Sequence, residues 1–260
     1  RIIYSLSVLI STSAIVLKTI PYGDTSVIAR MFTEDQGKVT ILAKGAWRPK
    51  NNAGALLEPM NHIYLQYYHK NSREIQVLKD GGFTQQFSNL RKELSKVIVG
   101  LTIVEMMDKS TLDNNPFPIL YRLGWRVLEK LNDEKQNIWL VFVFFLYQLS
   151  LRLGFLPNIK KCSKCNADLI SGCFDNYTGE LICVNCSTQS KISLDENSLS
   201  ALQKLEGLHL DDLQTLSINM QGITNSIQFL DLFISFHLEG LKKLRSMTML
   251  KQILNGGIIK

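Results

Sequence analysis

The stretch AIVLKTIPYGDTSVIARMFTEDQGKVTILAK, residues 14–44, contains three short runs of β-branched and apolar residues separated by two turns. The first turn is Pro21-Tyr22-Gly23-Asp24 and the second is Glu34-Asp35-Gln36-Gly37. Short apolar runs bounded by Gly, Pro and Asp are typical of β-strands joined by tight turns. The stretch therefore predicts strands at residues 14–20, 26–33 and 38–44.

The same pattern continues as far as residue 80. Two further apolar runs predict strands at 61–69 and 74–79, and a long loop at 45–59 separates the third strand from the fourth. Five short strands favour a small closed barrel, and an OB-fold inserts a helix or an extended arm at the position of this loop. We expect an OB-fold over residues 14–80, with a different small barrel as the alternative.

Basic residues are interleaved with aromatic ones in the second half of this predicted barrel. A groove that follows a nucleic-acid backbone needs Lys and Arg for the phosphates and aromatic rings for the bases. The candidates for DNA contact are Lys38, Lys44, Trp47, Arg48, Lys50 and Arg73, with Tyr64, Tyr67, Tyr68 and His69 close by in the sequence. Two alternatives stay open: some of the tyrosines fill the barrel core, and the basic loop residues are merely solvated.

After Gly81-Gly82 the apolar positions change to helical spacing. The predicted helices cover residues 86–110, 118–131, 134–153, a segment ending at Leu205, and a long amphipathic stretch at 223–253. The helix at 134–153 is apolar on nearly every side and is therefore expected to be central. It ends at Gly154-Phe155-Leu156-Pro157, where a glycine and a following proline stop a helix.

Arg122, Arg126 and Lys130 recur at every fourth position of the helix predicted at 118–131. Residues at this spacing lie on one face of a helix. A basic stripe of this kind is either a solvated face or a contact surface for a phosphate backbone or an acidic peptide, and solvation is the commoner role. Arg122 and Arg126 join the candidates for DNA contact on this basis.

Two Cys-x2-Cys pairs, Cys162 with Cys165 and Cys183 with Cys186, are separated by 17 residues. Two residues between thiols let one tight turn aim both sulfurs at a single ion, and two such turns complete a tetrahedron. The spacing predicts one structural zinc ion per chain in a ribbon at 159–190, with two disulfides or four free thiols as alternatives. Four protein ligands leave no position for a reacting water, so a catalytic metal is not expected.

Signatures of the common enzyme classes are missing from the sequence. It has no Gly-x4-Gly-Lys-Ser/Thr loop, no dinucleotide glycine fingerprint and no His-Glu-x2-His pair. The four histidines are scattered, and the fifth cysteine, Cys173, has the apolar flanks of a core residue. We expect a protein that is not an enzyme, while a nuclease or transferase whose residues assemble only in three dimensions stays open.

The chain of 260 residues has a formal net charge of +6. Residues 1–160 contain 20 Lys and Arg against 13 Asp and Glu, so the positive charge is concentrated before the cysteine pairs. Such an excess favours a polyanionic partner. No apolar run reaches the ~20 residues of a membrane-spanning helix. Paired cysteines of the metal-binding kind indicate a reducing compartment, so a cytoplasmic protein without a membrane partner is expected.

The expected fold is a multidomain α+β chain. An N-terminal five-stranded OB-fold β-barrel at 14–80 precedes a mainly α-helical domain, which a four-cysteine zinc ribbon at 159–190 divides into parts at 81–158 and 191–260. Residues 1–13 superficially resemble a secretion signal, and we expect them to be a leader of uncertain order.

Several segments resemble the RecO family of bacterial recombination mediators. They are Ile15–Thr19, Tyr22–Ser26, Phe32–Gly37, Ala43–Ala46, Arg48–Lys50, Gly154–Pro157 and Phe236–Ser246. The resemblance runs from about residue 14 to the end of the chain. Its most specific parts are Tyr22-Gly23-Asp24-Thr25-Ser26 and Ala43-Lys44-Gly45-Ala46.

The resemblance implies an OB-fold barrel and a helical domain that carries zinc in many members. It also implies binding of single- and double-stranded DNA, annealing of complementary strands, contact with the acidic C-terminal tail of single-strand-binding protein, and loading of the recombinase RecA together with RecR. The family is not known for hydrolytic activity, and its members work in the cytoplasm at the nucleoid. Its basic positions fall on Lys44, Arg48 and Lys50, whereas Trp47 stands where a small or basic residue is common.

Two functions of different class follow from these observations. One is a DNA repair and recombination mediator that binds and anneals DNA by neutralising phosphate charge. The other is a zinc-ribbon module that binds a protein or RNA and has no annealing activity. A strand-annealing assay separates them.

Overall fold

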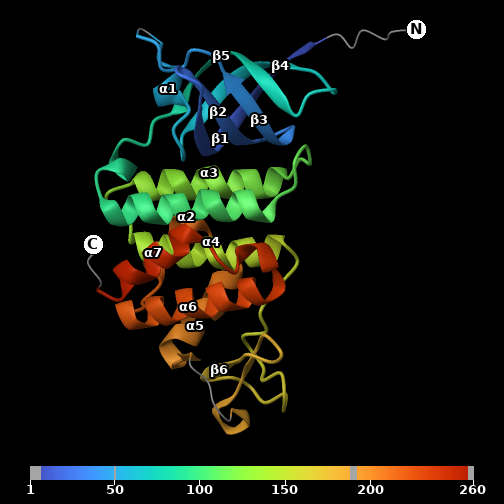
Figure 1. The fold of residues 1–260 in the computed structure, drawn as a ribbon. Helices are drawn as coiled ribbons and strands as arrows, with labels where there is room; N and C mark the ends of the chain where they lie inside the picture. Colours follow the sequence, from blue (N-terminus) through green and yellow to red (C-terminus); the bar gives the residue numbers. More distant parts are fainter. Residues whose placement is uncertain (1–6, 50, 188–191, 257–260) are drawn as a thin grey trace. The chain divides into compact units, whose positions relative to one another are not determined.

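Five strands close into a barrel in the order β1-β2-β3-β5-β4 (Figure 1). The structure is a computed structural model that describes residues 7–49, 51–187 and 192–256. The strands are β1 (Val8–Tyr22), β2 (Ser26–Thr33), β3 (Gly37–Ala43), β4 (His62–His69) and β5 (Ile75–Gln85). Neighbouring strands are antiparallel except β3 and β5, which run parallel. The prediction of a five-stranded OB-fold barrel is confirmed.

Strand β1 is longer than predicted and pairs with two neighbours. Its first half pairs with β4, from Val8 opposite His69 to Ile15 opposite His62, and its second half pairs with β2. A register shift after Val16 marks the bend between the two halves. Part of the segment expected to be a leader is therefore strand, from Val8 onward, while residues 1–6 lie outside the described residues.

The tyrosines of β4 are divided between its inner and outer faces. Tyr67 is fully buried in the barrel core, whereas Tyr64 and Tyr68 are 44% and 40% exposed. Successive side chains of a strand point to opposite faces, so residues 64 and 68 share the outer face and residue 67 lies on the inner one. One tyrosine belongs to the core, and two remain available on the surface.

Two helices pack against the barrel. After the short helix α1 (Ala53–Leu56) in the β3–β4 loop and the 3-10 turn η1 (Asn89–Arg91), α2 (Leu94–Ser110) and α3 (Pro118–Asn132) both contact β1 (Figure 1). Gly124 of α3 permits this packing, because a Cβ there would lie 2.3 Å from Met107 Cε and 3.2 Å from Ile15 Cδ1. The barrel, α2 and α3 form one compact unit, Arg1–Asn132, which we call the barrel unit. Its end does not coincide with the boundary expected after residue 80.

A buried lysine joins β3 to the C-terminal end of α2. Lys38 is 4% exposed, and its Nζ donates hydrogen bonds to the carbonyl oxygens of Asp108, at 2.6 Å, and Thr111, at 2.7 Å. The carboxylates of Asp108 and Asp113 lie 3.4 and 3.5 Å from the same nitrogen. Arg30 of β2 forms ion pairs with these two carboxylates as well. Lys38 is therefore a structural link between the barrel and its helices.

The second compact unit, Asp133–Lys260, is called the ribbon unit here. Its central helix is α4 (Ile138–Arg152), which buries nearly all of its side chains, as the apolar sequence predicted. Helix α5 (Glu196–Lys204) starts at Asp195, whose carboxylate accepts the Ser198 N–H at 2.9 Å, and is followed by 3-10 turns η3 (Leu205–Gly207) and η4 (Leu210–Thr215). Among the described residues, no helix combines the length and the apolar character needed to cross a membrane.

The prediction of one long helix at 223–253 is wrong. The structure has two helices, α6 (Met220–His237) and α7 (Arg245–Leu254), separated by an extended residue at Leu238 and the turn η5 (Glu239–Leu241). Leu241 and Leu244 in the connection are 2% and 3% exposed. The chain folds back so that these leucines are buried and Lys251 forms an ion pair with Asp231 of α6. A continuous helix would have left the two leucines without this packing.

Replacing Lys38 with Met should destabilise the barrel unit by about 2–3 kcal/mol, because two carbonyl oxygens would lose the hydrogen bonds from Lys38 and the mostly buried Asp108 carboxylate would keep only its ion pair with Arg30. Urea or thermal unfolding measures the change. The matched control is Lys18→Met, which removes an exposed lysine from β1. Equal stability of the two variants would contradict a structural role for Lys38.

Candidate metal centre and nucleic-acid interface

The four paired cysteines lie in two tight turns between α4 and α5. The first turn follows Lys161, and the second includes the 3-10 turn η2 (Val184–Cys186). The strands of the ribbon are β6 (Gly172–Asp175), β7 (Glu180–Ile182) and β8 (Ser193–Leu194), with β6 in the middle. These strands are short, so the turns depend on other constraints for their shape.

Backbone hydrogen bonds shape both turns. In the first, the Asn166 N–H donates to the Cys162 carbonyl at 2.9 Å, and Asn166 adopts a left-handed φ of 60°. In the second, the Cys186 N–H donates to the Cys183 carbonyl at 3.0 Å. Each turn therefore presents its two sulfurs on the same side.

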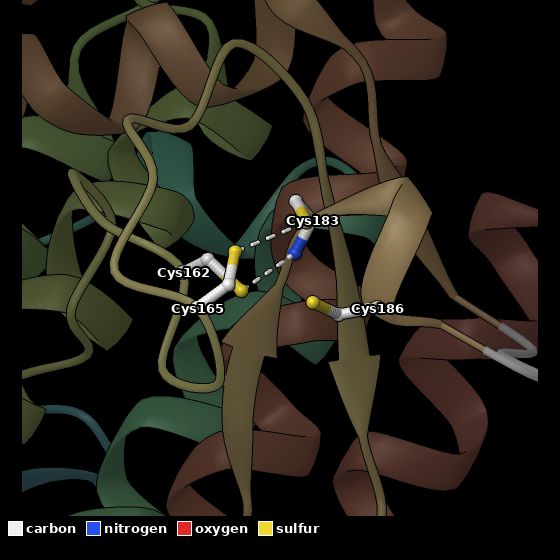
Figure 2. A group of neighbouring side chains, drawn as sticks. All are labelled: Cys162, Cys165, Cys183 and Cys186. Atoms are coloured by element: carbon white, nitrogen blue, oxygen red, sulfur yellow. Dashed lines mark hydrogen bonds between the residues drawn. The ribbon is translucent and has the colours of Figure 1, made fainter.

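All four sulfurs lie around a common centre (Figure 2). Every pair is within 4.8 Å, and Cys165 Sγ and Cys183 Sγ are 3.7 Å apart. Metal–sulfur bonds of ~2.3 Å in a tetrahedron place the sulfurs about 3.8 Å apart, whereas a disulfide requires ~2.0 Å. All five cysteines are free thiols in the structure. The arrangement fits four ligands of one metal ion and not two disulfides.

Their surroundings shift the pKa values of two of these thiols in opposite directions. Burial alone would raise the pKa of Cys162, but hydrogen bonds from backbone N–H groups, including that of Cys183 at 3.2 Å from Cys162 Sγ, lower this pKa to about 6. Side-chain hydrogen bonds with Cys183 and Cys165 raise the pKa of Cys186 to about 12. Four thiolates so close together repel one another unless a cation balances their charge. Metal binding should therefore release thiol protons.

The basic residues around the metal centre are already paired with acids. The ion pairs join Lys160 to Glu206 at 2.5 Å, Lys161 to Asp168 at 3.4 Å and Lys164 to Asp175 at 3.3 Å. The ribbon therefore presents little uncompensated positive charge. Cys173 lies on β6 and is 9% exposed, so the prediction that it is a core residue is confirmed.

The residues predicted to contact DNA do not form one cluster. Lys44, Trp47 and Arg48 lie together and exposed in the turn after β3. Arg73 is exposed in the β4–β5 turn, level with the start of β3, since Ile75 pairs with Thr40. At ~3.3 Å per residue, the two ends of β3 are about 20 Å apart. Lys44 and Arg73 are therefore on separate parts of the barrel surface.

The other predicted positions have different surroundings. Arg122 and Arg126 are exposed on α3, where Arg122 lies 4.0 Å from Glu34 and Arg126 lies 3.9 Å from Glu129. Lys38 is buried with its amino group fully engaged, so its position does not suit a phosphate contact. Lys50 lies outside the described residues.

Trp47 and Arg48 are held in place by two glycines. The Trp47 ring is 49% exposed and lies against Gly54, where a Cβ would approach Cδ1 to 2.6 Å. The Arg48 side chain crosses Gly45, which has a φ of 65°, and a Cβ there would lie 3.0 Å from Arg48 Cδ. Asn51 Nδ2 donates to the Gly45 carbonyl at 2.8 Å and secures the turn. An aromatic ring and a guanidinium group are thus presented side by side.

Two adjoining hollows lie beside this turn on the barrel surface. One, of about 410 Å³, has Lys44, Lys79, Asp80, Gly81 and Gly82 in its lining, and the other, of about 450 Å³, has Trp47, Arg48 and Glu58. Asn51 lines both. We call the two hollows together the glycine groove.

The floor of the glycine groove lies at Gly81-Gly82, where the sequence alone predicts a domain boundary. Both glycines are in β5, where Gly82 lies opposite the exposed Tyr64. A Cβ at Gly82 would meet nothing within 4 Å. Paired glycines inside a strand often mark close approach by a ligand, and this was the available signal.

An OB-fold barrel followed by a helical unit with a four-cysteine centre is the architecture that the resemblance implied. The family model described as Recombination protein O N terminal matches residues 7–87, and the one described as Recombination protein O C terminal matches residues 91–247. The chain therefore belongs to the RecO family of DNA repair proteins.

Curated relatives agree with this assignment. The DNA repair protein RecO of Salinibacter ruber is 37% identical over 153 residues, a match that spans 59% of each chain. The DNA repair protein RecO of Desulfatibacillum aliphaticivorans is 27% identical over 256 residues, which cover 94% of this chain and 97% of that protein. The protein of the same name from Listeria monocytogenes is 24% identical over 239 residues, 90% of this chain and 92% of its own.

Replacing Cys165 with Ser should reduce the bound metal from one ion per chain to a small fraction of that after dialysis, because three sulfurs do not complete the tetrahedron. Elemental analysis of the purified protein measures the content. Cys173→Ala is the matched control and should keep the metal. Unchanged metal content in Cys165→Ser would contradict the assignment of the four ligands.

Proposed function

We propose that the chain is a DNA repair and recombination mediator that binds single- and double-stranded DNA through the glycine groove and anneals complementary strands. Membership of the RecO family supports the role in DNA repair, and the glycine groove supports the position of the DNA-binding site. We further propose that it acts with RecR to assist recombinase loading on DNA coated by single-strand-binding protein, whose acidic C-terminal tail it contacts. It would act by binding and not as an enzyme, in the cytoplasm at the nucleoid.

The observation that carries this proposal is a group of basic side chains beside exposed rings, in a groove whose lining also includes Asp80 and Glu58. Among the described residues, no carboxylate forms an ion pair with Lys44, Arg48 or Lys79. Each can therefore replace a counterion at a phosphate. The bases of a single strand can stack on Trp47 and Tyr64, and each stacked base contributes on the order of 1–3 kcal/mol. Neutralising the phosphates of two strands lowers their mutual repulsion, which is what annealing requires.

We propose zinc as the ion of the metal centre. Four thiolates in closed tetrahedral geometry suit Zn²⁺ better than the oxygen-preferring divalent ions. The ion would hold the two cysteine turns of a ribbon whose strands have only two to four residues. Its role would be structural, since no protein ligand position is left for water.

One observation favours the second candidate function, a zinc-ribbon module that binds a protein or RNA without annealing DNA. Ile170, Tyr177 and Val184 of the ribbon are 70%, 94% and 61% exposed. Exposed apolar side chains on one small module are typical of contact surfaces. The two functions differ in their dependence on the glycine groove, which the following experiments use.

Replacing Lys44 and Arg48 together with Ala should slow the annealing of labelled oligonucleotides by about tenfold or more. It should also reduce the slope of log affinity against log salt by about 1.5, as expected for two lost phosphate contacts. The matched control, Lys109→Ala with Lys135→Ala, removes the same charge from exposed positions outside the groove. Annealing that is the same in both double variants, or affinity that is flat with salt, would exclude the groove and favour the second function.

Gly82→Glu tests the floor of the groove without disturbing the barrel, because a side chain at this position has open space. The added carboxylate should repel phosphates and weaken single-strand binding by about five- to tenfold, as measured by fluorescence anisotropy. Gly82→Gln has the same size and no charge. An equal loss in both variants would point to shape rather than to electrostatic repulsion of DNA.

A further inference from the structure

Another hollow of the barrel unit lies apart from the glycine groove. It has a volume of about 310 Å³ and lies where the β4–β5 turn approaches the connection between α2 and α3. The residues that matter for its chemistry are Gln36, Val39, Tyr67, His69, Arg73 and Asn114. We call it the Arg73 pocket. Pockets that hold small molecules start at about this size.

Two polar atoms in the wall of the Arg73 pocket lack hydrogen-bond partners. Tyr67 is 0% exposed, and its hydroxyl has no partner among the described residues. His69 bonds Asn71 Oδ1 through Nε2 at 2.8 Å, but its Nδ1 is buried and also has no partner. Buried polar atoms are nearly always hydrogen-bonded, and each exception requires an explanation. Two exceptions in one wall leave hydrogen-bonding capacity that a polar ligand could use.

The charge of the Arg73 pocket selects an anion. No acidic residue is among the described residues that line it. The Arg73 guanidinium has no ion-pair partner in the described parts of the chain. Burial raises the pKa of Tyr67 to about 12, so its hydroxyl stays protonated and can donate to an anion. Arginine donates in a fork that matches the oxygens of a phosphate.

The remaining lining suits a nucleobase. The side-chain amides of Gln36 and Asn114 each offer a donor and an acceptor, which is the combination that the edge of a base requires. Val39 and Pro116 add apolar surface for the face of a ring. A bare phosphate ion would leave this part of the pocket unused.

We propose that the Arg73 pocket binds one phosphorylated nucleotide, with the phosphomonoester at Arg73 and the Tyr67 hydroxyl and the base at Gln36 and Asn114. The phosphomonoester belongs either to a free nucleotide or to the end of a DNA strand. Binding at this pocket does not require the annealing function, because the pocket and the glycine groove lie at opposite ends of β3.

The test is calorimetric titration of the full chain with deoxyadenosine monophosphate, deoxyadenosine and inorganic phosphate. The nucleotide should bind, and the nucleoside and phosphate should each bind at least about tenfold more weakly, because each lacks half of the contacts. Comparing a short oligonucleotide with a 5′-phosphate to one with a 5′-hydroxyl then separates the two sources. A preference for the phosphorylated strand assigns the pocket to DNA ends, and equal affinity assigns it to free nucleotides.

Arg73→Ala should weaken nucleotide binding by about tenfold or more, and Tyr67→Phe by about three- to tenfold. Without ligand, Tyr67→Phe should keep the melting temperature or raise it, because it removes a buried hydroxyl that has no partner. Lys18→Ala, on the exposed face of β1, is the control for loss of charge. The proposal is overturned if the nucleotide does not bind, if phosphate alone binds equally well, or if both variants bind like the wild type. These measurements contain no annealing step, so their failure is distinct from failure of the proposed function.

Discussion

The hydrogen bonds that β1 shares with both β2 and β4 close the barrel, and the surfaces of this protein depend on that closure. Because the barrel is closed, successive side chains along a strand point alternately to the core and to the solvent. Tyr67 therefore completes the core while Tyr64 faces outward beside Gly82. At the glycine groove, Gly82 leaves that outer face without a side chain, while Gly81 pairs with buried Leu65 and faces inward.

The basic side chains of this chain have three different roles, which its net charge of +6 does not distinguish. Lys38 is desolvated and joins β3 to α2, where its charge is balanced by two carboxylates. The lysines of the ribbon are paired with neighbouring acids and contribute little to an external field. Lys44 and Arg48 have no such partner among the described residues and remain available to a polyanion. Only this last group supports the proposed function.

The cluster of four cysteines that could hold a metal ion was the most predictable site, because its sequence signal is local. A Cys-x2-Cys spacing defines a tight turn, and two such turns define a ligand set wherever the chain brings them together. The segment at 223–253 shows the opposite case. Its helical periodicity is continuous, yet the burial of Leu241 and Leu244 and the pairing of Lys251 with Asp231 break it into two helices. These contacts join residues far apart in the chain, and periodicity does not record them.

The strands, most of the helices and the cluster of four cysteines that could hold a metal ion were predictable from the sequence, since alternation, helical spacing and paired cysteines are local patterns. Which basic residues are available depends on how distant segments of the chain pack together. This packing buries Lys38, separates Arg73 from Lys44 by the length of a strand, and makes a groove floor of Gly81 and Gly82. The physical reason is that the exposure and pairing of a charge depend on neighbours from distant segments, and those neighbours are set by packing.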